Sequence, residues 1–185
     1  MDTVTIRSMS EADCSEIADI WLQGLEQTAE GLETDVASQV RASMQQYGEK
    51  ACSLEGDVGP EGCFLYERWN GKPAAIMYVA EYEGRVVGSV AVQQGMDLGE
   101  PHDDSTVASI WRMSVSNNVR RKGVGQKLME TAEAWAKSRS CTCIQLYTAN
   151  LVAGAFYEKL GFDVVSSAEI SPEVPVDIKT YKKAL

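Results

Sequence analysis

The chain has 185 residues, of which 44% are hydrophobic, and its 27 acidic against 17 basic side chains give a formal net charge of −10. This composition is that of an ordinary globular protein, and the length predicts a single domain over residues 1–185. The acidic balance argues against nucleic-acid binding, and no apolar run reaches the roughly 20 residues that a membrane-spanning helix needs.

The first half of the chain predicts one strand, two helices, a long loop and a hairpin. Apolar residues alternate as in a strand at Val4 and Ile6, and they recur at helical spacing after the capping residue Ser10. The dipeptide Glu83-Gly84 joins two runs rich in β-branched residues, which is typical of a β-hairpin. The later elements expected in this half are a helix over Glu33–Tyr47, a loop over Gly48–Lys72 and strands over Ile76–Tyr82 and Val86–Val92.

The second half predicts strands that alternate with helices. The expected elements are a polar loop over Gly95–Ser105, a strand over Val107–Val115, a helix over Gly123–Arg139, a strand over Cys143–Thr148, a helix over Leu151–Leu160, and strands over Phe162–Val165 and Val176–Tyr181. Hairpins imply antiparallel pairing, whereas strand-helix-strand units imply parallel pairing. We therefore expect an α/β (α+β) fold of order β-α-α-β-β-β-α-β-α-β-β. About four helices would flank a mixed, largely antiparallel sheet of six to seven strands.

Charge is distributed unevenly along the chain. Residues 1–104 hold 20 acidic and 6 basic side chains, a net charge of −14, whereas residues 105–185 hold 7 acidic and 11 basic ones, a net charge of +4. One interpretation is that the charges only keep the surface soluble. The other is that the C-terminal part binds an anion, while the N-terminal part faces a neutral or cationic molecule.

Cysteine and histidine are too few and too widely spaced for most metal sites. The five cysteines are an odd number, and the N-terminus lacks the features of a secretory signal, so we expect reduced thiols and a cytoplasmic protein. Cys141 and Cys143 form the closest pair, and His102 is the only histidine. Zinc usually needs four such ligands, so no metal is expected. A Gly-x-Ser-x-Gly nucleophile elbow is also lacking.

The most specific feature is the turn between the strand that ends at Val115 and the next helix. Gly123 and Gly125 let the backbone bend sharply and let its N–H groups approach an anion closely. The start of the helix adds N–H donors and partial positive charge, and the basic residues 120–122 add full charges. The turn therefore predicts a phosphate-binding site, and the simpler alternative is a basic surface turn.

This turn matches neither of two common phosphate-binding motifs. No Gly-Lys-Ser/Thr follows at the spacing of a Walker A loop, and Leu128 stands where Gly-x-Gly-x-x-Gly needs its third glycine. Through Arg120, Gly123 and Gly125 it instead resembles the (Gln/Arg)-x-x-Gly-x-(Gly/Ala) signature of the GNAT superfamily of N-acetyltransferases. The segment Asn150–Phe162 is similar to that superfamily's second signature. The order of elements also resembles the GNAT fold, although near the N-terminus it matches only in outline.

The resemblance implies that acetyl-CoA is the co-substrate, with its pyrophosphate on the N–H groups of residues 121–126. The main chain of Met113 and Val115 would pair with the pantetheine arm, in a slot beside the strand Cys143–Thr148. Asn150 would lie near the pantetheine, and its position just before an apolar helix explains it equally well as an N-cap. The cofactor-binding residues implied are Met113, Val115, Arg120, Arg121, Lys122, Gly123, Val124, Gly125, Gln126 and Asn150.

Tyr157 is the candidate general acid. Acetyl transfer to an amine expels the CoA thiolate, and because a thiol has a pKa near ~8.5, protonation helps it to leave. A tyrosine hydroxyl, with a pKa near ~10, is still protonated at neutral pH and can supply that proton. The alternative is that Tyr157 only packs in the core beside Phe156, Leu160 and Phe162.

The general base is the least defined part of the expected site. Several members of the superfamily use a carboxylate or histidine on the strand that leads to the turn, but residues 107–112 contain neither. Glu81 and Asp104, acting through a water molecule, are the weak candidates, together with His102 and Asp103 beside Asp104. An acidic surrounding would also stabilise the ammonium form of the acceptor and make its deprotonation harder.

We therefore expect an N-acetyltransferase that moves the acetyl group of acetyl-CoA to a primary amine by direct attack in a ternary complex. The amine would be a small molecule or a peptide, and the charge distribution favours a cationic one. The alternative function is a non-catalytic acyl-CoA-binding or sensing domain of the same fold. A nucleotide-binding enzyme is disfavoured, because the lysine and the Mg²⁺-binding Ser/Thr of such sites are missing. No nucleic-acid or membrane partner is expected, and the sequence leaves a homo-oligomer open.

Overall fold

The computed structural model describes residues 3–29, 38, 68–69, 72–73, 75–97, 100–101, 106–148, 151–171 and 174–185. Its elements in chain order are β1 (Thr5–Ser8), the 3-10 turn η1 (Glu11–Asp13), α1 (Cys14–Ala29), β2 (Arg68–Trp69), β3 (Lys72–Pro73), β4 (Ala75–Tyr82), β5 (Arg85–Gln94), β6 (Met96–Asp97), β7 (Glu100–Pro101), β8 (Val107–Val115), the 3-10 turn η2 (Asn117–Val119), α3 (Val124–Ser138), β9 (Cys143–Thr148), α4 (Leu151–Lys159), β10 (Asp163–Ser171) and β11 (Val174–Ala184). The expected helix over Glu33–Tyr47 lies outside the described residues, apart from the helical Ser38.

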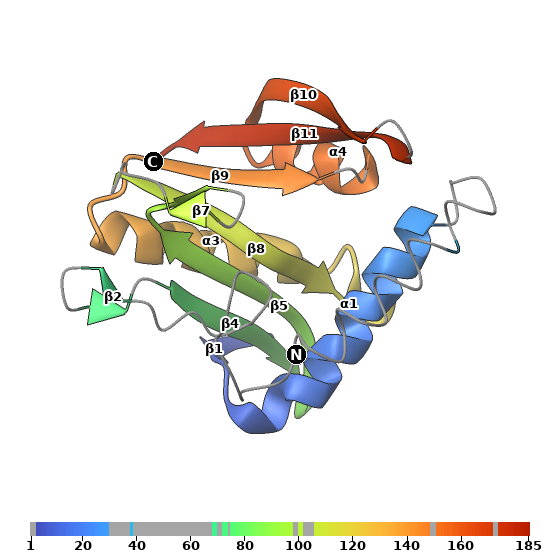
Figure 1. The fold of residues 1–185 in the computed structure, drawn as a ribbon. Coiled ribbons are helices and arrows are strands. Elements are labelled where there is room, and N and C mark those ends of the chain that lie inside the picture. The colour runs from blue at the N-terminus through green and yellow to red at the C-terminus, as the bar shows by residue number, and fades with distance from the viewer. Residues whose placement is uncertain are drawn as a thin grey trace.

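Seven strands form a central sheet in the order β1-β4-β5-β8-β9-β11-β10. The β8–β9 pair is parallel, and the other five neighbouring pairs are antiparallel. Helix α1 lies on one face of the sheet, and α3 and α4 lie on the other (Figure 1). The predicted mixed, largely antiparallel α/β fold is confirmed, with three α-helices of known bounds in the described part of the chain.

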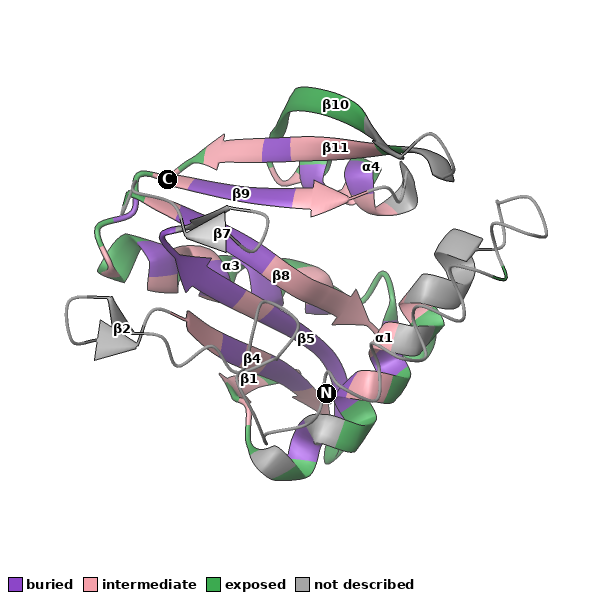
Figure 2. Ribbon diagram, viewed as in Figure 1, coloured by how far each residue is buried: buried purple, intermediate pink, exposed green. Residues whose placement is uncertain are grey.

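Two hydrophobic clusters, one on each face of the sheet, hold the helices in place. Figure 2 shows the buried residues concentrated on the central strands, above all on β5. Val124, Leu128 and Ala132 recur at helical spacing on α3, and all three are buried against the sheet, as their spacing predicts. On the other face, α1 packs on β4 and β5 through a smaller cluster of Ile17, Ile20, Met77, Val79 and Val86. The larger cluster therefore packs α3 on one face of the sheet, and the smaller cluster packs α1 on the other.

Positive backbone angles occur where the sequence predicts turns. Glu83 and Gly84 have φ values of 52° and 74°, which are typical of the two central residues of a tight hairpin turn. Gly161 has a φ of 85°, and beyond it the N–H of Phe162 bonds back to the carbonyl of Tyr157 at 3.1 Å. These two turns confirm the predicted hairpin and the predicted C-terminal stop of α4.

The structure corrects several predicted boundaries. The segment predicted as a loop up to Lys72 ends in the small β2–β3 hairpin, and the polar loop after Gly95 contains the small β6–β7 hairpin. Such two-residue strands are too short to show a periodic pattern in sequence. Strands β10 and β11 extend well beyond their predicted bounds. The added residues are mostly polar, and they are held by the pairing of β10 with β11 and of β11 with β9, which sequence alternation does not reveal.

An ionic network fixes the start of α1 to the sheet. Both guanidinium Nη atoms of Arg7 donate to the carboxylate of Asp13, at 2.7 and 2.8 Å, and its Nε donates to Glu81 at 3.0 Å. The backbone N–H of Ser10 donates to the carboxylate of Asp13, which is one half of a capping box. The hydroxyl of Ser10 also donates to this carboxylate, and the N–H of Asp13 bonds to the backbone carbonyl of Ser10 instead of to the hydroxyl. These hydrogen bonds, first of all those from Arg7, hold the pKa of Asp13 well below its usual range.

We expect Asp13→Asn to lower the free energy of unfolding by about 2 kcal/mol at pH 7, because partly buried hydrogen bonds to a charged group are lost. Since folding lowers the pKa of Asp13, its contribution is complete above pH ~4, the ordinary Asp value, and is lost as the pH falls below it. Urea titrations at pH 7 and pH 3 measure this. An equal loss of stability at both pH values would contradict an ionic role for Asp13.

Candidate functional site

The parallel strands β8 and β9 pair over only three residues at one end. The pairing runs from Val107 with Cys143 to Ser109 with Gln145, although β8 continues to Val115. Figure 1 shows the two strands diverging beyond this point. From residue 110 onwards, the edge of β8 toward β9 is therefore not paired with that strand. An extended ligand can form main-chain hydrogen bonds there, as an added strand does.

A bulge interrupts β8 in this diverging half. Arg112 has a φ of 49°, and the pairing of β8 with β5 shifts register at this place. The hydroxyl of Ser89 donates to the carbonyl of Arg112 at 3.1 Å. As a result Trp111 and Arg112 both face α1, where the guanidinium lies 5.0 Å from the centroid of the Trp21 ring. Bulges often occur next to active sites, where they redirect side chains.

The turn between β8 and α3 presents a row of backbone N–H groups. Gly123 is the N-cap of α3 with a φ of 79°, and the first hydrogen bond of the helix runs from the N–H of Lys127 to its carbonyl at 3.1 Å. Among the described residues, the N–H groups of residues 121–126 have no acceptor. They lie at the positive end of the helix dipole. This geometry fits the phosphate-binding turn that the sequence predicts.

Three exposed basic residues surround this turn. The Nε of Arg120 donates to the carbonyl of Val115 at 3.2 Å and so ties the turn to the end of β8. Arg121 has a φ of 62°, in the left-handed region that a tight turn requires. The Nζ of Lys122 lies 5.1 Å from the centroid of the Tyr82 ring. Positive charge is thus concentrated beside the N–H groups, which favours an anionic ligand.

Gly125 lies where α3 approaches both β8 and α4. A Cβ atom at this position would lie 3.1 Å from Cζ of Phe156 and 3.3 Å from Cε of Met113. At Gly123, in contrast, a Cβ atom would meet nothing within 4 Å. The fold thus brings the turn into contact with the α4 segment, so the two predicted signatures meet in space.

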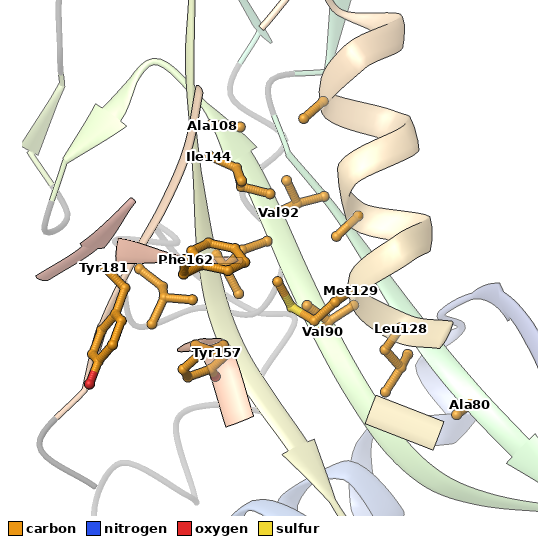
Figure 3. Close-up of a cluster of buried hydrophobic side chains, with 14 of the residues drawn as sticks. Ala80, Val90, Val92, Ala108, Leu128, Met129, Ile144, Tyr157, Phe162 and Tyr181 are labelled. Carbon is orange, nitrogen blue, oxygen red and sulfur yellow. The ribbon is translucent and has the colours of Figure 1, made fainter. Parts of the chain in front are cut away.

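Tyr157 lies on α4 and is buried, with 6% of its surface exposed. Its ring centroid is 5.3 Å from that of Phe156 and 5.9 Å from those of Phe162 and Tyr181. Figure 3 shows Tyr157, Phe162 and Tyr181 at one end of the hydrophobic cluster. Burial, with a smaller effect of Tyr181, raises the pKa of Tyr157 above its ordinary value, so the hydroxyl stays protonated. This protonation state suits a general acid, and the ring contacts equally suit a core residue.

The predicted base candidates do not gather at this site in the described part of the chain. The carboxylate of Glu81 accepts the hydrogen bond from Arg7 at 3.0 Å and belongs to the network at the start of α1. Asp104 and Asn150 lie outside the described residues, as do His102 and Asp103. The described side chains contain no group of three or more possible metal ligands. Within these residues, no helix is long and apolar enough to cross a membrane.

Sequence reasoning missed a row of polar side chains on the α1 face of the sheet. Gln93, Ser109 and Gln145 occupy adjacent positions on β5, β8 and β9, and they are 2%, 0% and 1% exposed. The amide of Gln145 donates to the hydroxyl of Ser109 at 3.2 Å. Each of them directly follows a buried apolar residue of its strand, and this position in sequence is the signal that would have revealed them.

Comparison with known families gives one match that covers most of the chain. Residues 43–162 match the family model described as "Acetyltransferase (GNAT) family". This segment contains β8, the turn, α3 and α4, so it includes the diverging strands and both predicted signatures.

Comparison with individual proteins agrees with this match. The Xenopus tropicalis protein named N-acetyltransferase camello is 35% identical over 102 residues, which are 54% of this chain and 43% of the relative. The N-acetylaspartate synthetase of the same species is 29% identical over 120 residues, 64% of this chain and 40% of the relative. Each match thus spans less than half of the relative's own length. The crystal structure of the PaiA N-acetyltransferase from Thermoplasma acidophilum in complex with coenzyme A has a TM-score of 0.72 at 16% identity, over 99% of both chains.

Proposed function

We propose that this chain, which belongs to the acetyltransferase (GNAT) family, is a single-domain N-acetyltransferase that transfers the acetyl group of acetyl-CoA to a primary amine. The observation that carries the proposal is the row of N–H groups from residues 121–126, beside the strand edge from which β9 diverges. The coenzyme A complex of a structural neighbour with the same fold is consistent with this ligand.

The residues of the turn fit the polyphosphate of acetyl-CoA. Gly123 and Gly125 bend the backbone, and the N–H groups from Arg121 to Gln126 would bind phosphate oxygens, with Val124 already buried in the core. The side chains of Arg120, Arg121 and Lys122 would neutralise the phosphate charges. The main chain of Met113 and Val115, on the edge of β8 from which β9 diverges, would pair with the pantetheine arm, and Asn150 is proposed to lie beside it.

Acetyl transfer needs a proton donated to the leaving sulfur and a proton removed from the acceptor nitrogen. The amine nitrogen forms a bond to the carbonyl carbon of the thioester, and the bond from that carbon to sulfur breaks. We assign Tyr157 as the general acid that protonates the leaving sulfur, because burial keeps its hydroxyl protonated. The ammonium group of the acceptor must lose a proton first. We propose that a water molecule passes this proton to the carboxylate of Glu81 or Asp104.

The acceptor proposed is a small amine or the amine of a peptide. The net charge of −14 over residues 1–104, which include α1, favours the approach of a molecule that carries an ammonium group. The names of the similar proteins include a synthetase of N-acetylaspartate, so amino acids belong in any test beside polyamines and peptides.

A second candidate function is a non-catalytic domain that binds acyl-CoA. The observation in its favour is the lack of any carboxylate or histidine on β8, together with the pairing of Glu81 with Arg7. Such a domain would keep the phosphate-binding turn and would lack turnover.

We expect the purified protein to bind acetyl-CoA and to release free thiol only when an amine is present. Isothermal titration calorimetry measures the binding, and a thiol-reactive dye measures turnover over a panel of polyamines, amino acids and peptides. Binding without thiol release on any amine would favour the non-catalytic domain. An absence of binding would contradict both candidate functions.

A further inference from the structure

In the part of the chain that the structure describes, two buried N–H donors on the α1 face of the sheet have no hydrogen-bond partner. They are the indole Nε1 of Trp111 and the amide Nε2 of Gln93, and each is closed to solvent without an acceptor in the described part of the chain. An indole N–H can only donate a hydrogen bond. Buried donors almost always have an acceptor, because leaving one unpaired destabilises the folded state. Two such donors on one face therefore call for an explanation.

The two donors occupy neighbouring positions of the sheet. Gln93 lies directly opposite Ser109, and Trp111 is two residues further along β8 on the same face. In a sheet, such diagonal positions are about 7–8 Å apart, within reach of long side chains. Ser109 is also the last residue of β8 that pairs with β9. The unpaired donors thus lie where the two strands begin to diverge.

The bulge adds a cation to this group of donors. Because the strand gains a residue at Arg112, its side chain faces α1 together with that of Trp111, instead of facing α3. Its guanidinium lies 5.0 Å from the centroid of the Trp21 ring, which places it above the same face of the sheet. Among the described residues, the face therefore combines neutral N–H donors with the positive charge of Arg112, and such a combination suits an oxygen that carries full or partial negative charge.

We infer that this cluster, formed by Gln93, Trp111 and Arg112, recognises the carbonyl or carboxylate oxygen of an α-aminoacyl acceptor. The inference rests on the proposed function, because it places the acceptor on the α1 face beside the free edge of β8. An α-amino acid or a peptide N-terminus carries its amine one carbon away from such an oxygen. The acceptor would thus offer its ammonium to the acidic surroundings and its oxygen to the cluster.

Matched sets of acceptors test this inference. Leucine, leucinamide and 3-methylbutylamine share one side chain, and lysine, lysinamide and cadaverine share another. We expect kcat/KM to be higher for the amino acid or its amide than for the amine that lacks the oxygen. Comparison of the acid with the amide then distinguishes a free amino acid from a peptide N-terminus as the source of the oxygen.

Variants of Trp111 and Gln93 test whether their N–H donors cause the preference for acceptors that carry the oxygen. Trp111→Phe keeps an aromatic ring and removes the N–H, and Gln93→Met keeps the length of the side chain. Each should reduce the preference about 10–100-fold, the effect of one hydrogen bond to a charged group, with an unchanged KM for acetyl-CoA. Trp135→Phe is the matched control, because Trp135 packs on the α3 face beside Arg139 and should keep the preference.

The outcomes distinguish a failure of this inference from a failure of the proposed transferase function. If the amines without the oxygen react as fast in the wild type, or if both variants keep the preference, the inference is wrong while the transferase function stands. If no acceptor releases thiol, the proposed function fails. In that case, calorimetry compares the affinity for leucine with that for 3-methylbutylamine, in the wild type and in Trp111→Phe. Equal affinities in all four measurements would overturn the inference about the cluster.

Discussion

Replacing Tyr157 by phenylalanine should lower kcat about 10²–10⁴-fold while acetyl-CoA still binds, because the proton for the leaving sulfur is no longer supplied. The ring contacts of Tyr157 with Phe156, Phe162 and Tyr181 do not depend on its hydroxyl, so the variant should keep the fold. Steady-state kinetics with saturating acetyl-CoA and amine measure kcat, and calorimetry measures the affinity for acetyl-CoA.

The matched control for this variant is Tyr181→Phe. Tyr181 belongs to the same buried aromatic group, and burial also raises its pKa, but no role in catalysis is assigned to it. Its variant should keep kcat within a few-fold of the wild type. If Tyr157→Phe turned over as fast as Tyr181→Phe, Tyr157 would be a core residue only.

The pH dependence of the wild type adds an independent check on Tyr157. A general acid is active in its protonated form, and burial raises the pKa of Tyr157 above the ordinary value near ~10. Loss of its proton should therefore not reduce kcat as the pH rises from 7 to about 9.5. An alkaline decline of kcat within that range, absent from Tyr157→Phe, would contradict the raised pKa.

The parts of the fold that follow from local rules could be predicted from the sequence. The hairpin at Glu83-Gly84 and the end of α4 at Gly161 rest on residues that accept positive φ values. The buried stripe of α3 rests on helical spacing alone, and β8 and β9 have the bounds that their alternating residues predict. The turn before α3 also follows from local sequence, because two glycines and a helix start suffice to place its N–H groups.

The features that depend on long-range pairing could not be predicted. The bulge at Arg112 appears only when the register of β8 against β5 is known, and without it Trp111 and Arg112 would face opposite sides of the sheet. The pairing of Glu81 with Arg7 depends on β1 lying beside β4. The row of Gln93, Ser109 and Gln145 requires three strands to lie in one register. The proposed acceptor side of the site thus depends on tertiary structure, whereas the proposed phosphate side depends on local sequence.

The second large effect is expected from Gly125→Val, which should raise the KM for acetyl-CoA about 100-fold or more. Its side chain would meet Phe156 and Met113, whose atoms already lie 3.1 and 3.3 Å from the position of a Cβ atom. The start of α3 would have to move away from β8, at a cost of about 1–3 kcal/mol in stability for the overpacked contact. The N–H groups from residues 121–126 would then lose their alignment with the free edge of β8. Two lost hydrogen bonds to phosphate account for the expected increase.

The same substitution at Gly24 is the control that separates this local effect from the general cost of a larger side chain. Gly24 is a helical glycine of α1, where a Cβ atom would lie no closer than 3.8 Å to its nearest neighbour, the hydroxyl of Ser114. Gly24→Val should therefore leave the KM for acetyl-CoA within a few-fold of the wild type. Thermal melting of both variants tests whether each one is still folded at the assay temperature. A KM for acetyl-CoA that stays unchanged in folded Gly125→Val would show that the phosphates do not bind at the start of α3.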